Sequence, residues 1–135
     1  MQHTKPTNQT IDAQAALGQV YERLNKPQNA LTSYKQFLES AEECGDENLV
    51  EQACEKIGLV MNQIGNYQES VQYFEKQFQL SQNSKDEARI HKARVQLGFA
   101  KGNADMMQHL KKLVDGDNLK TEQENGHQSA TQQIK

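Results

Sequence analysis

The stretch Ala53–Phe78 reads ACEKIGLVMNQIGNYQESVQYFEKQF and decides the fold. Its central residue is Gly58, and glycine also stands forty positions earlier, at Gly18, and forty positions later, at Gly98. Core positions around these glycines agree between the copies. A period of about 40 residues is typical of helical repeat proteins, in which each unit stacks only on its neighbours. The pattern therefore predicts a slim layered array, which also suits a chain that is only 35% hydrophobic.

Each of the first two copies is predicted to be a helical hairpin. Pro27 is tolerated at a helix start, where its missing N–H is not needed, and Gly45 is placed to end that helix with a left-handed C-cap. Asp46 is expected to cap the next helix, and Gly65-Asn66 to form the turn of the second hairpin. The apolar stripes expected in the two cores are Ala13, Ala16, Leu17, Val20, Tyr21, Leu24, Ala30, Leu31, Tyr34, Phe37, Leu38 and Ala41, then Leu49, Val50, Ala53, Ile57, Val60, Met61, Ile64, Val71, Phe74, Phe78 and Leu80.

The third copy is degraded. Its first helix is expected to carry Ala88, Ile90, Ala93, Val95, Leu97, Gly98 and Ala100, with a turn at Gly102-Asn103 and a second helix over Met106, Met107, Leu110, Leu113 and Val114. A divergent terminal unit is expected because it has no following neighbour. The predicted fold is all-α, an α-solenoid of three hairpins (six helices) in a right-handed superhelical arc over 9–115, with units 9–45, 46–85 and 86–115. A disordered leader, 1–8, and a disordered Gln-rich tail, 116–135, are expected to flank it.

Composition excludes several function classes. The net charge is only −3, and no long Lys/Arg run interleaves with aromatic residues, so nucleic acid is not an expected partner. No apolar run approaches the ~18 to 20 residues that span a bilayer, so a soluble, intracellular protein without membrane attachment is predicted. Cys44 and Cys54 lack the spacing of a disulfide framework or a zinc site and are expected to be small buried thiols.

The repeat resembles the tetratricopeptide repeat, a helix-turn-helix unit with a small residue and Leu-Gly in its first helix. Gly18, Gly58 and Gly98 stand at the glycine of that helix, Tyr21 at its aromatic position and Gly65-Asn66-Tyr67 at the turn. Ala30 and Ser70 match the small position of the second helix, and Tyr34 and Phe74 match its aromatic position.

The ~40-residue spacing is longer than the usual ~34 residues of the family and is similar to the long-repeat class that includes the LGN/Pins scaffolds. Small long-repeat adaptors of cilia and axonemes are also similar. The resemblance implies a non-catalytic adaptor or scaffold that binds a peptide or helix of a protein partner through its concave face. It implies a cytoplasmic or cytoskeletal location, with the cilium or axoneme as one such place.

In such an array the first helix of each unit lines the inner face. Helical spacing from each glycine places a partner-binding groove at Asp12, Gln19, Glu22, Gln52, Glu55, Leu59, Asn62, Lys92, Val95 and Phe99. Apolar anchors at Leu59 and Phe99 with polar flanks suit an extended or helical peptide. The alternative is that Leu59 and Phe99 pack against adjacent helices. An alternative function is that of a structural subunit embedded in a larger assembly through its ends or its convex face.

Charge is distributed unevenly along the chain. Acids cluster between Glu39 and Glu55, and bases cluster at Arg89, Lys92, Arg94 and Lys101. This asymmetry favours steering of a dipolar partner or head-to-tail association, or else both clusters are solvated helix faces.

Catalysis has no support in the sequence. His91 and His109 lack a carboxylate or cysteine at metal-ligand spacing, and Cys54 lacks a histidine partner at a fixed spacing. No enzyme activity, cofactor or metal is predicted, and the sequence leaves the oligomeric state open.

Overall fold

The structure, a computed structural model, describes the backbone of residues 5–133 and the side chains of residues 5–116. It contains α1 (Asn8–Arg23), α2 (Pro27–Cys44), α3 (Glu47–Gln63), α4 (Tyr67–Ser84) and α5 (Glu87–Gln133). The described backbone is helical without strands, so the all-α prediction is confirmed. The chain divides into two compact units, one ending at Lys101 and one beginning at Gly102.

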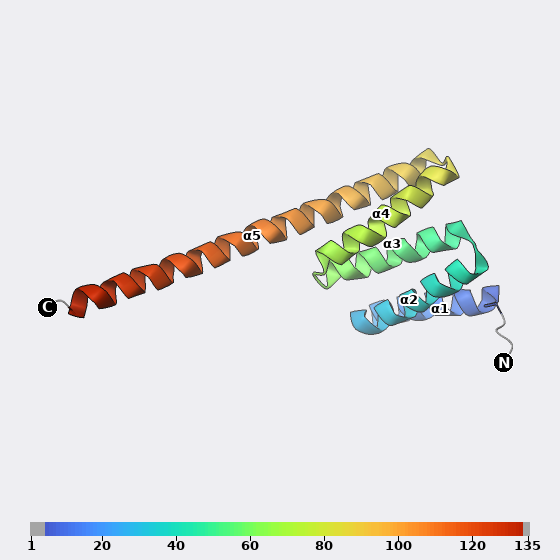
Figure 1. Ribbon diagram of the computed structural model, residues 1–135. Helices are drawn as coiled ribbons and strands as arrows, with labels where there is room; N and C mark the ends of the chain where they lie inside the picture. Colours follow the sequence, from blue (N-terminus) through green and yellow to red (C-terminus); the bar gives the residue numbers. More distant parts are fainter. Residues whose placement is uncertain (1–4, 134–135) are drawn as a thin grey trace. The chain divides into compact units, whose positions relative to one another are not determined.

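The unit that ends at Lys101 is a stack of antiparallel helices. α1 pairs with α2, and α3 pairs with α4, while α2 also packs on α3, so consecutive helices are neighbours in space (Figure 1). Residues 87–101 of α5 pack on α4 through Leu97 and Ala100, which contact Phe74. Two hairpins and a fifth helical stretch therefore make up this unit.

Local signals set the helix ends as the sequence predicted. Pro27 is the first residue of α2, and Gly45 ends that helix in the left-handed conformation with φ 70°. The side chain of Asp46 caps α3 because its Oδ1 accepts hydrogen bonds from the backbone N–H groups of Asn48 (3.1 Å) and Leu49 (3.3 Å). All three assignments are confirmed.

The connections repeat with the same period as the helices. Each hairpin turn contains a residue with positive φ, Asn25 (59°) in the first and Gly65 (90°) in the second. Forty residues after Asp46, Asp86 caps α5 in the same way and accepts from the backbone N–H of Ala88 at 3.0 Å. The forty-residue period of the sequence therefore corresponds to a repeat of backbone geometry as well as of packing.

The core of the first unit lies between successive layers. The largest cluster joins α1, α2 and α3 through Ile11, Ala30, Leu31, Tyr34, Phe37, Ala53, Ile57, Val60 and Met61. Smaller clusters join α2 to α3 through Ala41, Val50 and Cys54, and α4 to α5 through Phe74, Leu97 and Ala100. This layered burial is typical of repeats that share faces only with their neighbours.

The expected core stripe of α1 is wrong at five of its six positions, since only Tyr21 is partly buried. Leu17 is 44% exposed, whereas its counterpart forty residues later, Ile57, is 0% exposed. Ala13, Ala16, Val20 and Leu24 are exposed as well. The physical reason is position in the stack: α3 follows α2 and packs on it, whereas α1 is the first described helix and has no earlier hairpin beside it.

The third hairpin does not form, and the count of six helices is corrected to five over residues 5–133. Gly102 and Asn103, the predicted turn, lie inside α5. At the turn position where Asn25 and Gly65 have positive φ, the third copy has Asp105, which continues the helix. Met106, Met107, Leu110, Leu113 and Val114 are consequently exposed on α5 instead of forming the stripe of a second packed helix.

The flanking segments also differ from expectation. The helix α1 already begins at Asn8, and residues 1–4 of the predicted leader lie outside the described residues. The backbone of 116–133 is helical where a disordered tail was expected, and 134–135 lie outside the described residues. Gln, Lys, Glu and Ala favour helix, and this segment contains no proline to interrupt one. The right-handed superhelical arc stays a prediction.

Candidate functional site

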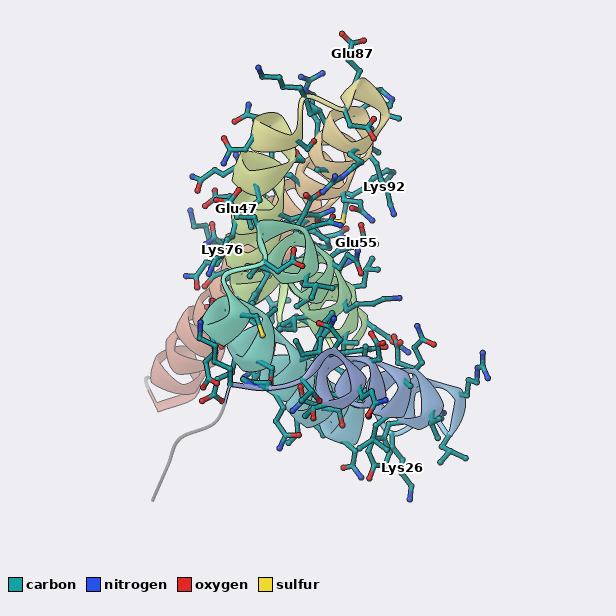
Figure 2. The ribbon with its side chains drawn as sticks, turned by 90° about the vertical axis from the view of Figure 1, so that its right-hand side faces the viewer. Lys26, Glu47, Glu55, Lys76, Glu87 and Lys92 are labelled. Carbon is teal, nitrogen blue, oxygen red and sulfur yellow. The ribbon has the colours of Figure 1, made fainter. Side chains whose placement is uncertain are left out.

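The ten predicted groove residues lie on α1, α3 and the 87–101 stretch of α5. We call the surface that carries them the A face. Figure 2 shows Glu55 and Lys92, which belong to the A face, on the side of the stack opposite to Lys76 of α4. Asp12, Gln19, Glu22, Gln52, Leu59, Lys92, Val95 and Phe99 are exposed, while Glu55 and Asn62 are half-buried. Their accessibility is what a binding surface requires.

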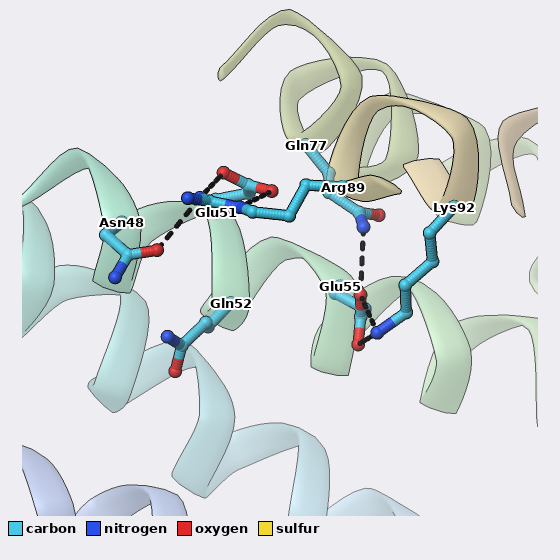
Figure 3. Close-up of a pocket in the computed structure, with 7 residues that line it drawn as sticks. All are labelled: Asn48, Glu51, Gln52, Glu55, Gln77, Arg89 and Lys92. Atoms are coloured by element: carbon cyan, nitrogen blue, oxygen red, sulfur yellow. Dashed lines mark hydrogen bonds and ion pairs between the residues drawn. The ribbon is translucent and has the colours of Figure 1, made fainter. Parts of the chain in front are cut away.

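A pocket of about 340 Å³ opens on the A face between α3 and α5. It is lined by Asn48, Glu51, Gln52, Glu55, Gln77, Arg89 and Lys92 (Figure 3). Three of the predicted groove residues, Gln52, Glu55 and Lys92, are among these. The pocket is therefore polar, with two carboxylates and two cations in its wall.

Arg89 forms one side of the pocket. Its guanidinium donates to both carboxylate oxygens of the buried Glu51 and, through Nη2, to Oδ1 of Asn48 at 2.8 Å. This arrangement joins α5 to α3 by a planar, charge-assisted interaction. Because Glu51 is nearly inaccessible to water, its pairing with Arg89 offsets part of the desolvation cost of its carboxylate.

Gln77 of α4 connects the other side. Its Nε2 donates to Oε2 of Glu55 and to Oε1 of Gln96, each at 2.9 Å. Lys92 Nζ lies 3.1 Å from both carboxylate oxygens of Glu55. The Oε1 atom of buried Gln77 has no hydrogen-bond partner among the described residues. Polar side chains from three helices are thus held in one network at the floor of the pocket.

Apolar side chains flank this polar pocket. Phe99 is 71% exposed and Leu59 is 42% exposed, so the alternative in which both pack into the helix interfaces is wrong. Leu59 follows Glu55 by four residues, and Phe99 follows Lys92 by seven, so each lies on the same helix face as its pocket residue. The A face therefore combines a polar pocket with exposed apolar groups one or two helical turns away.

In the first hairpin, one A-face residue forms a hydrogen bond with a buried core residue. Glu22 accepts a hydrogen bond from the hydroxyl of buried Tyr34. Burial, this hydrogen bond and the negative charge of Glu22 together raise the pKa of Tyr34 above its usual value. Glu22 therefore helps to satisfy a buried hydroxyl, while Asp12 and Gln19 are exposed on the same helix.

The residues predicted to define the repeat meet in pairs. The ring of Tyr34 covers Gly18 so closely that a methyl group there would overlap it, and a Cβ atom on Gly58 would lie 2.8 Å from Cζ of Phe74. Ala30 and Ser70, one turn before these rings, are fully buried. Gly98 differs, since a Cβ placed there would meet no atom of the described residues within 4 Å apart from its chain neighbours and the adjacent backbone of its own helix.

Comparison with known proteins identifies this repeat. Models described as tetratricopeptide repeat match residues 13–47 and 51–84, which together make up about half of the chain. The chain belongs to the tetratricopeptide repeat family. The crystal structure of the tetratricopeptide repeat domain of Arabidopsis FLU matches 79% of this chain and 99% of its own, with a TM-score of 0.58 and 21% sequence identity. A search of curated proteins found no match. Tetratricopeptide repeats generally mediate protein–protein interactions.

The interaction that sequence reasoning missed in this tetratricopeptide repeat protein is the pairing between its charge clusters. Glu51 and Glu55 of the acidic cluster bind Arg89 and Lys92 of the basic cluster, so these four side chains are not merely solvated. The available signal was the period: residues 51 and 89, like 55 and 92, are separated by almost one repeat, which places them on successive first helices. No comparable pattern in the sequence predicted the role of Gln77.

The tetratricopeptide repeat fold is typically a non-catalytic interaction module, and the titratable groups considered for catalysis are placed as follows. His91 and His109 are exposed, and Cys44 is half-buried. Burial raises the pKa of Cys54 to about 11, so its sulfur is a protonated thiol at neutral pH. Across the described residues, no three His, Cys, Asp or Glu side chains gather as metal ligands. A search of the same part of the chain found no helix with the length and apolar character that a bilayer crossing requires.

Proposed function

We propose that this protein is an adaptor whose A face binds a peptide or helix of a partner protein. The observation that supports this most directly is the combination of exposed Phe99 and Leu59 with the polar pocket between α3 and α5. Exposed aromatic and aliphatic side chains beside polar groups that can form hydrogen bonds are the usual anatomy of a protein-binding surface.

The ordered walls of the pocket support the same proposal. Arg89–Glu51 and Lys92–Glu55 hold α5 against α3, so the two helices that carry Phe99 and Leu59 keep a set spacing. A preorganised surface loses little conformational entropy when a partner binds. Asn48 and Gln52, which also line the pocket, offer amide donors and acceptors to a peptide backbone.

The partner therefore combines two features. It places an apolar side chain against Phe99 or Leu59 and polar groups over the pocket, as an extended segment or an amphipathic helix does. A cytoplasmic, cytoskeletal or ciliary location, and the alternative role as a structural subunit of a larger assembly, stay predictions from the sequence.

The test uses the full chain as bait in a quantitative pull-down from cell extract. We expect Phe99→Glu and Leu59→Glu each to lose the proteins that the wild-type chain retains, because a charge replaces an apolar anchor. Leu17→Glu is the matched control, since Leu17 is as exposed as Leu59 but lies outside the A-face set. Circular dichroism must show the same helix content in all variants. Retention by both A-face variants would refute the proposal.

A further inference from the structure

Gly98, the glycine of the third repeat, lies on an exposed helix face, whereas the equivalent faces at Gly18 and Gly58 are covered. Gly18 and Gly58 are buried beneath an aromatic ring of the following helix, whereas Gly98 is exposed. Since α5 continues through Gly102 instead of turning, no second helix of a hairpin follows residues 87–101. This stretch is a first helix whose hairpin partner is missing among the described residues.

The two complete hairpins define what the missing helix must carry. In α2, Ala30 is fully buried, and Tyr34, four residues later, covers Gly18. In α4, Ser70 is fully buried, and Phe74, four residues later, covers Gly58. A helix that fits Gly98 in the same way therefore has a small residue followed after four positions by an aromatic one.

Residues 99–135 do not contain such a helix. Forty residues after Ser70 and Phe74 stand Leu110 and Val114, and no Phe, Tyr or Trp occurs after Phe99. The aromatic side chains of α2 and α4 that fit a glycine are already used, on Gly18 and Gly58. A helix that completes the third hairpin is therefore not supplied by residues 99–135.

The side chains around Gly98 on α5 indicate which charge the missing second helix carries. Positions spaced three, four and three apart share this face with the glycine. In the second repeat they are Glu51, Cys54, Gly58 and Met61, all buried; in the third they are His91, Arg94, Gly98 and Lys101, all exposed. Arg94 stacks on Phe78, with Cζ 5.8 Å from the ring centroid, and Lys101 lies 3.9 Å from Glu75. Two cationic side chains, Arg94 and Lys101, thus stand on α5 at the positions where the second repeat has the buried Cys54 and Met61.

We propose that the face of α5 formed by His91, Arg94, Gly98 and Lys101, here named the terminal face, docks an acidic helix of another protein. The helix places a Phe or Tyr ring on Gly98, with a small residue four positions earlier. Its carboxylates lie opposite Arg94 and Lys101. This contact completes the third hairpin in trans, and its four residues on α5 are not among the ten residues of the A face.

The probe follows from the existing hairpin. It is a labelled 18-residue peptide with the sequence of α4, Tyr67–Ser84, in which Tyr73 and Leu80 are replaced by Glu. Tyr73 and Leu80 pack against the cluster that contains Cys54, whose counterpart on α5 is Arg94, so the new carboxylates are placed for that guanidinium. The same peptide with Phe74→Ala is the control that lacks the ring.

Fluorescence anisotropy with the full chain tests the proposal. The acidic peptide is expected to bind, and Gly98→Leu is expected to weaken binding by roughly tenfold or more, as loss of a central anchor does. Gly116→Leu is the matched control, because Gly116 is also a helical glycine of α5 with open space around its Cβ position. Arg94→Glu should weaken binding too, and added salt should do so for the wild-type chain.

Several outcomes would overturn the proposal. These are no binding of the acidic peptide, equal binding by the Gly98→Leu variant, or equal binding of the Phe74→Ala peptide. Loss of binding by Leu59→Glu would assign the peptide to the A face instead. Sedimentation velocity adds a further test: a concentration-dependent dimer that Gly98→Leu abolishes would identify a second copy of this chain as the occupant and would refute the acidic helix.

Discussion

The ring of Tyr34 lies directly on Gly18, so that α1 and α2 approach at a distance that leaves no room for a side chain at residue 18. The ring of Phe74 lies on Gly58 in the same way. These two contacts give the repeat its register, because a glycine on one helix and an aromatic ring on the next fit in only one relative position.

Replacement of each repeat glycine by alanine should change the free energy of unfolding differently in the three repeats. Gly18→Ala and Gly58→Ala are expected to lower the free energy of unfolding by ~1–3 kcal/mol, because the new methyl group displaces a buried ring. Gly98→Ala should raise it by ~0.5–1 kcal/mol, the gain from replacing an exposed helical glycine. Urea unfolding followed by circular dichroism measures all three. Destabilisation by Gly98→Ala similar to the other two would contradict the open environment of Gly98.

Removal of the Tyr34 hydroxyl should weaken the first hairpin. Tyr34→Phe keeps the ring on Gly18 but loses the hydrogen bond to Glu22, at an expected cost of ~0.5–1.5 kcal/mol. Phe74 occupies the equivalent place in the second hairpin and shows that a ring without a hydroxyl is compatible with the fold. The midpoint of urea unfolding is the measurement, and no change would mean that the hydrogen bond contributes no net stability.

Replacement of equivalent apolar residues by alanine should lower stability by different amounts in the first and second repeats. Ile57→Ala is expected to cost ~2–5 kcal/mol because a fully buried side chain is lost. Leu17→Ala, at the same repeat position, should cost under about 1 kcal/mol because no preceding helix covers Leu17 among the described residues. Thermal unfolding of both variants provides the comparison, and equal losses would place an unrecognised segment over α1.

The ion pair beneath the pocket should matter more than the one on the opposite side. Arg89→Met leaves the carboxylate of Glu51, 9% exposed, without its cation, and should cost ~1–3 kcal/mol. Lys76→Met is the matched control, because Lys76 and Glu42 are both about half exposed, and should cost ~0–1 kcal/mol. Unfolding in urea at neutral pH measures both, and the ranking fails if the two losses are equal.

The two cysteines should differ in reactivity. Cys54 is fully buried with a pKa of about 11, so at pH 8 a maleimide should modify half-buried Cys44 first, and Cys54 should react rapidly only in denaturant. Mass spectrometry of the time course distinguishes the sites. Rapid double modification of the folded chain would contradict the burial of Cys54.

The same burial predicts a pH dependence of stability. Above the ordinary thiol pKa of 9.0, the unfolded chain loses the Cys54 proton while the folded chain retains it. The unfolded state then binds fewer protons, so the free energy of unfolding falls as pH rises from 9.0 to about 11. The raised pKa values of Tyr34 and Tyr73 act in the same direction. Cys54→Ala should therefore show a shallower decline than the wild-type chain, and an unchanged slope would exclude this contribution.

Much of the fold followed from residues that act over a single turn. Asp46 caps its own helix, Gly45 and Gly65 supply positive φ, and Pro27 begins α2, so each needs only its sequence neighbours. The forty-residue spacing of Gly18, Gly58 and Gly98 then placed these pieces in a repeat. For the candidate site, the same spacing correctly placed Gln52, Glu55 and Lys92 on one surface.

Features that depend on which helix packs beside a residue could not be predicted from local sequence patterns. Leu17 and Ile57 occupy the same repeat position but have opposite burial, and the buried Glu51 pairs with Arg89, which reaches it from α5. By itself, the sequence determined helices, caps and period, because helix formation is local. The tertiary structure decided that the third hairpin stays open, that the charge clusters pair and that Gly98 is uncovered, because burial and ion pairing require a neighbour that arrives from a distant part of the chain.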